Sequence, residues 1–340
     1  MTDTRLAEAF ASQSRACASL GSPFMGRLMA LFAERYTRDM PLGARLFDWP
    51  GDVSSRGHSL PLRMAGALHA LRLQGDAGLD RVYPPMEVAD DDLWAAVLDA
   101  LRRETAAIDA FIDSPPQTNE VRRAAVLIAA GNWLAGRYGL PLRLSEMGAS
   151  AGLNLMWDRF ALETPEGRIG PEGAMTLRPE MRGATPAPGP VEVVEREGVD
   201  LNPLDPVADA LRLTAYLWPD QPERLALTRA AIDMAEARVE RSDAADWVES
   251  RLAPRPGTCH MVYSTIAFQY FPPDTQARIT AAMERAGAAA TADTPLAWVW
   301  MEADERPDGA GIGARLWPGD EHVDLGRIDF HGRWLDWRAP

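Results

Sequence analysis

The residues best suited to chemistry occupy one short stretch of the chain, residues 142–160. Glu146 is followed at two-residue intervals by Gly148, Ser150 and Gly152. The residues up to Glu146 alternate between apolar and polar after a proline, which indicates a strand, and the residues after Gly152 suit a helix. In α/β folds, a strand, a tight turn of small residues and a helix bring backbone N–H groups and a helix N-terminus to a ligand.

Three interpretations of this turn compete. The dinucleotide fingerprint G-x-G-x-x-G does not fit, because Ser150 and Leu153 stand where its second and third glycines should be. The residues Gly148–Gly152 match G-x-S-x-G, the nucleophile elbow of α/β-hydrolases. The stretch from Glu146 to Gly152 is also similar to the acidic-x-Gly-x-Gly-x-Gly turn of S-adenosylmethionine (SAM) methyltransferases. There the acidic residue closes the first strand, and the turn passes beneath the methionine part of the cofactor.

The composition narrows the class of protein. The 340 residues, 46% hydrophobic and 25% charged, suit one large globular domain or two ordinary ones. The net charge of −14 disfavours a nucleic-acid partner, whose binding depends on clustered basic residues. The basic residues are all arginine, which excludes a Schiff-base lysine, a pyridoxal-phosphate enzyme and a P-loop lysine.

Location and metal content are also constrained. The sequence has no long apolar span and no N-terminal signal pattern, so we expect no membrane segment. Cys17 and Cys259 do not make a disulfide framework, which favours a cytoplasmic protein. The five histidines are scattered and lack partners at ligand spacing, so we expect no metal. The sequence leaves the oligomeric state open.

The pattern of apolar residues changes along the chain and predicts two regions. Residues 1–138 are expected to form a mainly helical N-terminal region, with the fifth helix opening at Gln117–Glu120. Residues 139–340 are expected to form an α/β domain interrupted by a Gly- and Pro-rich insertion at about 161–190. Helical spacing in the first region covers residues 3–37 in two helices, 62–69, 90–113 and 117–134.

Strands alternate with helices in the second region. This order predicts a Rossmann-like, methyltransferase-type, mostly parallel sheet with an antiparallel C-terminal edge. In the tail, we expect two extended pieces that turn near Gly326, with His331 inside the second. The predicted strands are 142–146, 191–194 (running towards 198–203), 238–242, 258–264, 296–301, 322–325 and 328–337, and the predicted helices are 206–218, 221–237, 246–252 and 273–289.

The surrounding chain favours the methyltransferase interpretation over the hydrolase. A nucleophile elbow normally follows several strands, whereas about 140 mainly helical residues precede Ser150. The order Ser150, then Asp243 or Asp304, then His331 does match a hydrolase triad, so a serine hydrolase stays an alternative. Against it, His331 is predicted inside a strand rather than in an exposed loop.

The methyltransferase interpretation assigns carboxylates to the cofactor. Asp200 follows the second predicted strand and suits the ribose hydroxyls, and Asp243-Ala244 follows the third and suits the adenine amine. Asp200 lies further from Glu146 than the usual twenty or so residues, and the insertion accounts for the difference. A helix cap for Asp243 and a turn role for Asp200 before Pro203 are the structural alternatives.

Four separated blocks, in order, resemble an uncharacterised bacterial family, domain of unknown function 2332. The resemblance spans nearly the whole chain and implies a methyltransferase-like core behind a helical N-terminal region. It implies no particular reaction, because the family has no established one. The blocks are Gln117–Glu120, Glu146–Leu155, Gly198–Asp205 and His331–Trp337.

These observations lead to one expected function, SAM-dependent methyl transfer to an unidentified small molecule. A non-catalytic ligand-binding domain on the same fold is the alternative from another class. Candidate catalytic residues are Glu302, Tyr263 and His331, although packing is a serious alternative for the last two. Candidate cofactor-binding residues are Gln117, Asn119, Glu146, Gly148, Ser150, Gly152, Asn154, Asp200, Asn202, Asp243 and Ala244.

Overall fold

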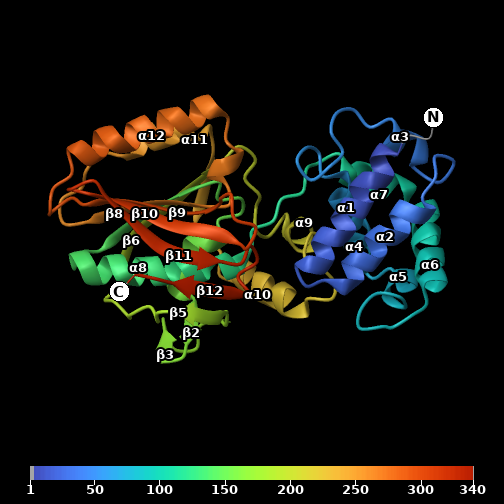
Figure 1. The fold of residues 1–340 in the computed structure, drawn as a ribbon, viewed down its shortest axis with the longest axis horizontal. Helices are drawn as coiled ribbons and strands as arrows, with labels where there is room; N and C mark the ends of the chain where they lie inside the picture. Colours follow the sequence, from blue (N-terminus) through green and yellow to red (C-terminus); the bar gives the residue numbers. More distant parts are fainter. Residues whose placement is uncertain (1–3, 340) are drawn as a thin grey trace. The chain divides into compact units, whose positions relative to one another are not determined.

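The computed structural model of the protein describes residues 4–339 and divides the chain into two compact units. The helical unit contains the chain up to Thr118 together with Ala208–Ala226. The α/β unit contains Asn119–Val207 and the chain from Leu227 onward. This division differs from the expected boundary after residue 138, because the helix that precedes the first strand packs with the sheet (Figure 1).

The helical unit forms because its apolar residues recur at helical spacing and bury a shared core around Phe10, Leu28 and Phe32. The second helix begins after Ser22, whose side chain accepts a hydrogen bond from the N–H of Met25. Its helices are α1 (Arg5–Ser19), α2 (Pro23–Arg35), α3 (Gly43–Phe47), α4 (Leu60–Leu73), α5 (Ala77–Asp80), α6 (Asp90–Arg103), α7 (Thr105–Ile112), α9 (Ala210–Ala215) and the start of α10 (Pro222–Asp233).

Two helical predictions need correction in this unit. The expected helix 90–113 is two helices, because the chain leaves helical geometry at Glu104, which has φ −111°. The expected helix 206–218 is confined to α9 and packs within the helical unit, although it lies between two strands in sequence.

A nine-stranded sheet forms the centre of the α/β unit, in the order β5-β12-β11-β10-β9-β8-β1-β6-β7. The block from β7 to β9 is parallel throughout, and the C-terminal strands β10 to β12 are antiparallel, as predicted. The long strands are β1 (Leu142–Met147), β6 (Val193–Asp200), β8 (Cys259–Thr265), β9 (Leu296–Ala303), β10 (Ala310–Trp317) and β11 (Glu321–Ile328). The short strands are β5 (Glu180–Gly183), β7 (Arg238–Arg241) and β12 (Trp334–Trp337).

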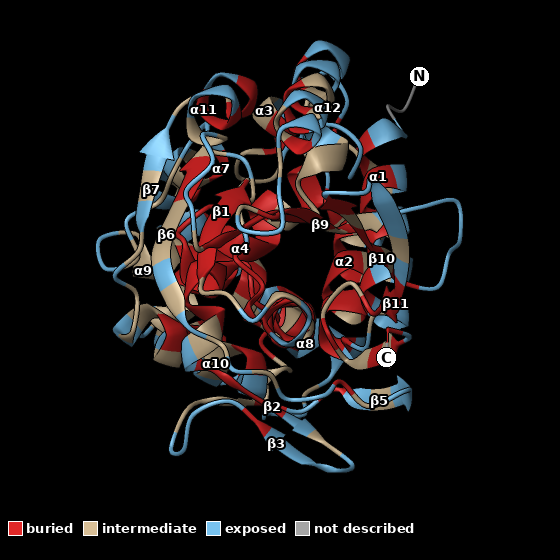
Figure 2. Ribbon diagram, turned by 90° about the vertical axis from the view of Figure 1, so that its left-hand side faces the viewer, coloured by how far each residue is buried: buried red, intermediate tan, exposed pale blue. Residues whose placement is uncertain are grey.

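Helices cover both faces of this sheet. α8 (Ala124–Tyr138) lies on one face, and α11 (Ala244–Arg251) and α12 (Pro273–Ala288) lie on the other (Figure 1). β1 is buried along its whole length, whereas β3, β5 and β7 at the margins are largely exposed (Figure 2). A near-continuous apolar run such as that of β9, residues 296–301, is typical of a parallel strand covered on both faces.

The insertion after the first strand is more ordered than expected. It forms a small sheet, β3-β2-β4, and then supplies β5 to the edge of the main sheet. Its strands are β2 (Ala161–Thr164), β3 (Gly167–Ile169) and β4 (Thr176–Leu177). The insertion thereby separates β1 from its neighbour β6 in sequence but not in space.

The C-terminal prediction was wrong in two respects. The sequence analysis did not identify β10, which pairs with both β9 and β11. The expected turn at Gly326 is also absent, because β11 runs through this residue, and its positive φ of 121° fits a local irregularity in the pairing. The turn lies instead at residues 329–333, so His331 is in a turn and not in a strand.

Candidate functional site

The turn after β1 lies at the point where the strand order reverses. From β1, the chain proceeds to β6 and β7 on one side and then returns to β8 and β9 on the other. Open α/β sheets bind ligands at such a switch point, beyond the carboxyl ends of the strands. Glu146 lies opposite Tyr263 of β8 and Gly198 of β6, so these strands end beside the turn.

The turn itself requires unusual backbone angles. Gly148, Ser150 and Gly152 have φ values of 71°, 55° and 72°, in the left-handed region that favours glycine. A Cβ on Gly148 would lie 2.4 Å from the Cβ of Ala267, and one on Gly152 would lie 2.9 Å from Val239 Cγ2. Close packing against neighbouring segments therefore explains both glycines. The expected close approach of the turn to a cofactor stays a prediction.

Side chains from two other segments hold the turn in place. The N–H of Ser150 donates to Asp200 Oδ2 over 2.9 Å, and the N–H of Asn202 donates to Asp200 Oδ1 over 2.8 Å. The N–H of Leu153 donates to Asn119 Oδ1 over 2.9 Å. Asn119 thus holds the start of η2 (Leu153–Arg159), a 3-10 helix, instead of capping the helix that follows it in sequence.

Four buried polar side-chain atoms around the turn have no hydrogen-bond partner among residues 4–339. They belong to Glu146 (Oε2), Ser150 (Oγ), Asn154 (Oδ1) and Tyr263 (Oη). Each of these residues is at least nine-tenths buried. Because buried polar groups are normally paired, such a group of unpaired atoms indicates a place where a polar ligand or water is bound. The Nδ2 of Asn154 already donates to the carbonyl of Glu120, which orients the side chain.

Burial also decides the protonation of this cluster. Burial, and then the charge of Asp200, raise the pKa of the Glu146 carboxyl well above its usual range, against the opposing effect of Arg123. Burial, followed by the charges of Glu146 and Asp158, raises the pKa of the Tyr263 phenol. Both shifts favour the protonated form, in which each side chain can donate a hydrogen bond.

Arg123 connects the switch point to the C-terminal turn. It lies in η1 (Val121–Arg123), and its guanidinium donates to the carbonyls of Thr265, over 3.2 Å, and Phe330, over 3.1 Å. A Cβ on Gly332 would lie 2.6 Å from the Cβ of Arg122, so the turn that carries His331 packs against η1. Asp329 shapes that turn by accepting a hydrogen bond from the N–H of His331 over 3.0 Å.

Two predicted carboxylates have structural partners. Glu302 accepts hydrogen bonds from the hydroxyl of Ser264 and from the N–H groups of the three residues 267–269. Asp243 is the N-cap of α11, where it accepts from Ala245 and Asp246, and Ala244 is buried behind it. These contacts are those of loop and helix anchors.

The remaining predicted residues divide between the two units. Asn202 lies next to Asp200, and its Oδ1 accepts from Arg241 over 3.0 Å. Gln117 belongs to the helical unit.

The sequence analysis missed several members of the site. Arg123 and the partly buried Asp158–Arg196 ion pair, with contacts of 2.6 and 2.9 Å, were not singled out. The signal for Arg123 was its place three residues after the end of the Gln117–Glu120 block. Among residues 4–339, no helix is long and apolar enough to cross a membrane. Nor do three or more His, Cys, Asp or Glu side chains come together as a metal-binding group within that range.

Comparison with known proteins identifies a family but no characterised relative. No curated protein and no solved structure matches the chain significantly. One family model covers nearly all of it, from residue 7 to residue 337, and includes every block around the turn. The chain therefore belongs to the family described as an uncharacterized protein conserved in bacteria, domain of unknown function 2332.

Proposed function

We propose that the α/β unit is a Rossmann-like, methyltransferase-type domain that binds SAM at the carboxyl ends of β1 and β6. In order of appearance, leaving the insertion aside, the parallel strands are arranged 3-2-1-4-5, an order typical of nucleotide-binding sheets. The observation that carries the proposal is the group of four buried, unpaired polar atoms beside the turn after β1. The substrate would be a small molecule that accepts a methyl group through O, N or S.

The side chains around the turn fit the polar groups of such a cofactor. Asp200 ends β6, and each of its oxygens retains a lone pair beyond the backbone hydrogen bond that it accepts, so it can accept from ribose hydroxyls. The hydroxyl of Ser150 can donate, the carboxyl of Glu146 can donate in the protonated form that its burial favours, and the Oδ1 of Asn154 can accept.

The chemistry would depend mainly on positioning. Bound SAM supplies an electrophilic methyl group, and the protein contributes by orienting the acceptor for in-line attack. The raised pKa of Tyr263 makes this phenol a hydrogen-bond donor and not a base. His331, on the turn that Asp329 shapes, is the candidate that takes a proton from the acceptor.

Calorimetric titration of the full chain with SAM and with S-adenosylhomocysteine tests the proposal. We expect saturable binding of both ligands and, for Asp200→Ala, an affinity at least tenfold lower. Asp205→Ala is the matched control, because Asp205 accepts from a backbone N–H in the same loop, over 2.9 Å. Absence of heat and of a thermal shift at millimolar ligand would exclude the cofactor. Binding without methyl turnover on any acceptor would favour the non-catalytic alternative.

One observation favours a second candidate, the serine hydrolase. Ser150 has the left-handed backbone that a strained nucleophile elbow requires. However, its Oγ makes no hydrogen bond with any imidazole in the described chain, whereas a nucleophilic serine needs an adjacent base. Covalent labelling of the wild-type protein by a fluorophosphonate, lost in Ser150→Ala, would establish the hydrolase and contradict the methyltransferase.

A further inference from the structure

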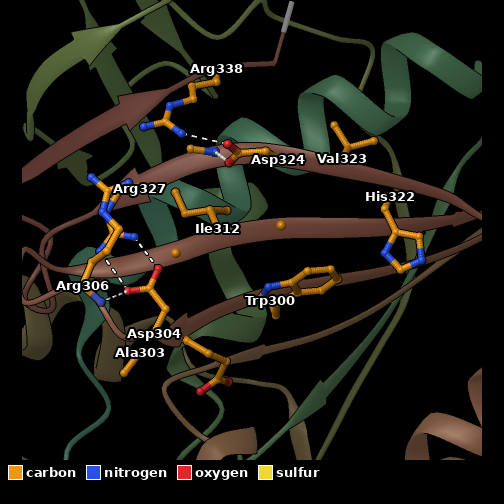
Figure 3. A pocket seen from close by; sticks show the side chains of 14 residues that line it. Trp300, Ala303, Asp304, Arg306, Ile312, His322, Val323, Asp324, Arg327 and Arg338 are labelled. Carbon is orange, nitrogen blue, oxygen red and sulfur yellow. Dashed lines mark hydrogen bonds and ion pairs between the residues drawn. The ribbon is translucent and has the colours of Figure 1, made fainter.

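An open hollow lies on the sheet away from the turn after β1, on the part formed by β9, β10 and β11 (Figure 3). Its volume is about 450 Å³, within the range of roughly 300–1,000 Å³ for small-molecule sites. The residues that line this hollow take no part in the proposed SAM site. One of them, Glu302, also accepts hydrogen bonds from the loop after β8.

Trp300 and two glycines form the floor of the hollow. Trp300 lies opposite Gly313 in the pairing of β9 with β10, and Gly311 lies opposite Glu302. A Cβ on Gly313 would lie 2.3 Å from Cζ2 of Trp300, so the indole can lie against β10 only because this position is glycine. Trp298 packs edge-on against Trp300, with ring centroids 6.1 Å apart, and so restricts the position of the Trp300 indole.

Charged side chains surround this aromatic floor in opposite pairs. Arg327 is ion-paired with Asp304 at one end of the hollow, and Arg338 donates to Asp324 over 2.8 Å at its upper margin (Figure 3). Arg306, the third arginine of the lining, is ion-paired with Asp308 over 3.4 Å. Each guanidinium therefore faces a carboxylate already, and the hollow offers donors and acceptors without a dominant charge, because Glu302, Asp304 and Asp324 balance the three arginines.

We propose that this hollow binds an uncharged, hydroxyl-rich ring of the monosaccharide class, stacked on Trp300. An anionic ligand would meet Asp304 and Asp324, and a cationic one would meet the arginines, so neither gains a net charge advantage. Hydroxyl groups donate and accept at once, which matches the alternating margin. The C–H groups on the less polar face of a pyranose carry slight positive charge and suit the negative face of an indole.

The test uses the full chain labelled with ¹⁵N at its tryptophan indoles, observed by NMR while neutral sugars are added. The probes are methyl glucoside, methyl galactoside and N-acetylglucosamine, with glucose 6-phosphate as the charged comparison. Trp300→Phe identifies the Trp300 signal among the 11 tryptophans. We expect that signal to move and saturate with at least one neutral sugar, and glucose 6-phosphate to bind no more tightly.

Gly313→Val examines the floor without removing the Trp300 side chain. The added side chain displaces the indole, so we expect about a tenfold loss of sugar affinity. Trp334→Phe is the control, because Trp334 of β12 packs against the guanidinium of Arg182 on β5 and does not line the hollow. The proposal is overturned if no neutral sugar moves the Trp300 signal of the folded wild-type protein, or if the phosphorylated sugar binds more tightly. Because no step involves SAM, this result is independent of the titration with that cofactor.

If circular dichroism shows that Trp300→Phe does not fold, the Trp300 signal is identified instead by the shift that Gly313→Val causes in it. The wild-type titration then decides the question alone. Loss of sugar binding in Trp334→Phe as well as in Gly313→Val would also overturn the assignment to this hollow.

Discussion

The N–H of Ser150 donates to the carboxylate of Asp200 over 2.9 Å, so the end of β6 holds the turn that follows β1. The two residues are 50 positions apart, because the β2–β5 insertion lies between them. A charged acceptor on a backbone N–H in a left-handed turn both orders the backbone and sets the shape of the site.

Removing the carboxylate of Asp200 should loosen the turn. For Asp200→Ala, we expect the free energy of unfolding to fall by about 2–3 kcal/mol, since two N–H groups lose a charged acceptor. Asp205→Ala, in the same loop, should cost less than about 1 kcal/mol, because its hydrogen bond is exposed. Urea unfolding of both variants measures the difference, and equal losses would show that Asp200 is not the anchor.

The backbone of Ser150 should store a measurable strain. A non-glycine residue at φ 55° costs about 1 kcal/mol, so Ser150→Gly should unfold at a higher urea concentration than Ser150→Ala. Comparing these two variants cancels the loss of the hydroxyl, which both lack. A lower or equal stability of the glycine variant would contradict a strained turn.

Glu146 should make stability depend on pH. Its pKa is raised in the folded protein above the unfolded value near 4.5, so the folded state keeps a proton that the unfolded state loses. The contribution of Glu146 is therefore fully present below that unfolded pKa and is lost as pH rises towards the folded pKa. In Glu146→Gln this loss disappears, so the variant should gain stability relative to wild type by up to ~1.4 kcal/mol per pH unit above about pH 5.

Urea unfolding of Glu146→Gln and wild type across this range gives the comparison. Burial raises the pKa of Glu302 as well, and its effect cancels because both proteins contain it. Parallel stability curves for the two proteins would mean that Glu146 is ionised in the folded state.

Glu302 should act as an anchor and not as a catalyst. Glu302→Ala leaves the N–H groups of residues 267–269 without their acceptor, and we expect a loss of about 3 kcal/mol in the free energy of unfolding. Glu305→Ala, an exposed carboxylate a few residues on, is the control and should stay within about 0.5 kcal/mol of wild type. Normal stability of Glu302→Ala together with lost methyl turnover would reverse this assignment.

The local pattern of residues determined most of the secondary structure. Helical spacing predicted α1, α2 and α12, and apolar runs predicted β1, β8 and β9, because these periodicities follow from the backbone geometry of each element. The same reasoning missed β10, where Gly311 and Gly313 lie between the apolar residues and weaken the sequence signal of a strand, and it placed His331 in a strand instead of a turn.

Only the tertiary structure decided how these elements meet. The pairing of β1 with β6 across the insertion, the hydrogen bonds from Arg123 to Thr265 and Phe330, and the hollow over Trp300 all join segments far apart in sequence. The sequence alone placed a turn of small residues between Glu146 and Gly152, because glycine and small polar residues favour a turn at these positions. Which of those residues are buried, neutral or already paired depends on the packing of distant segments, and no local pattern contains it.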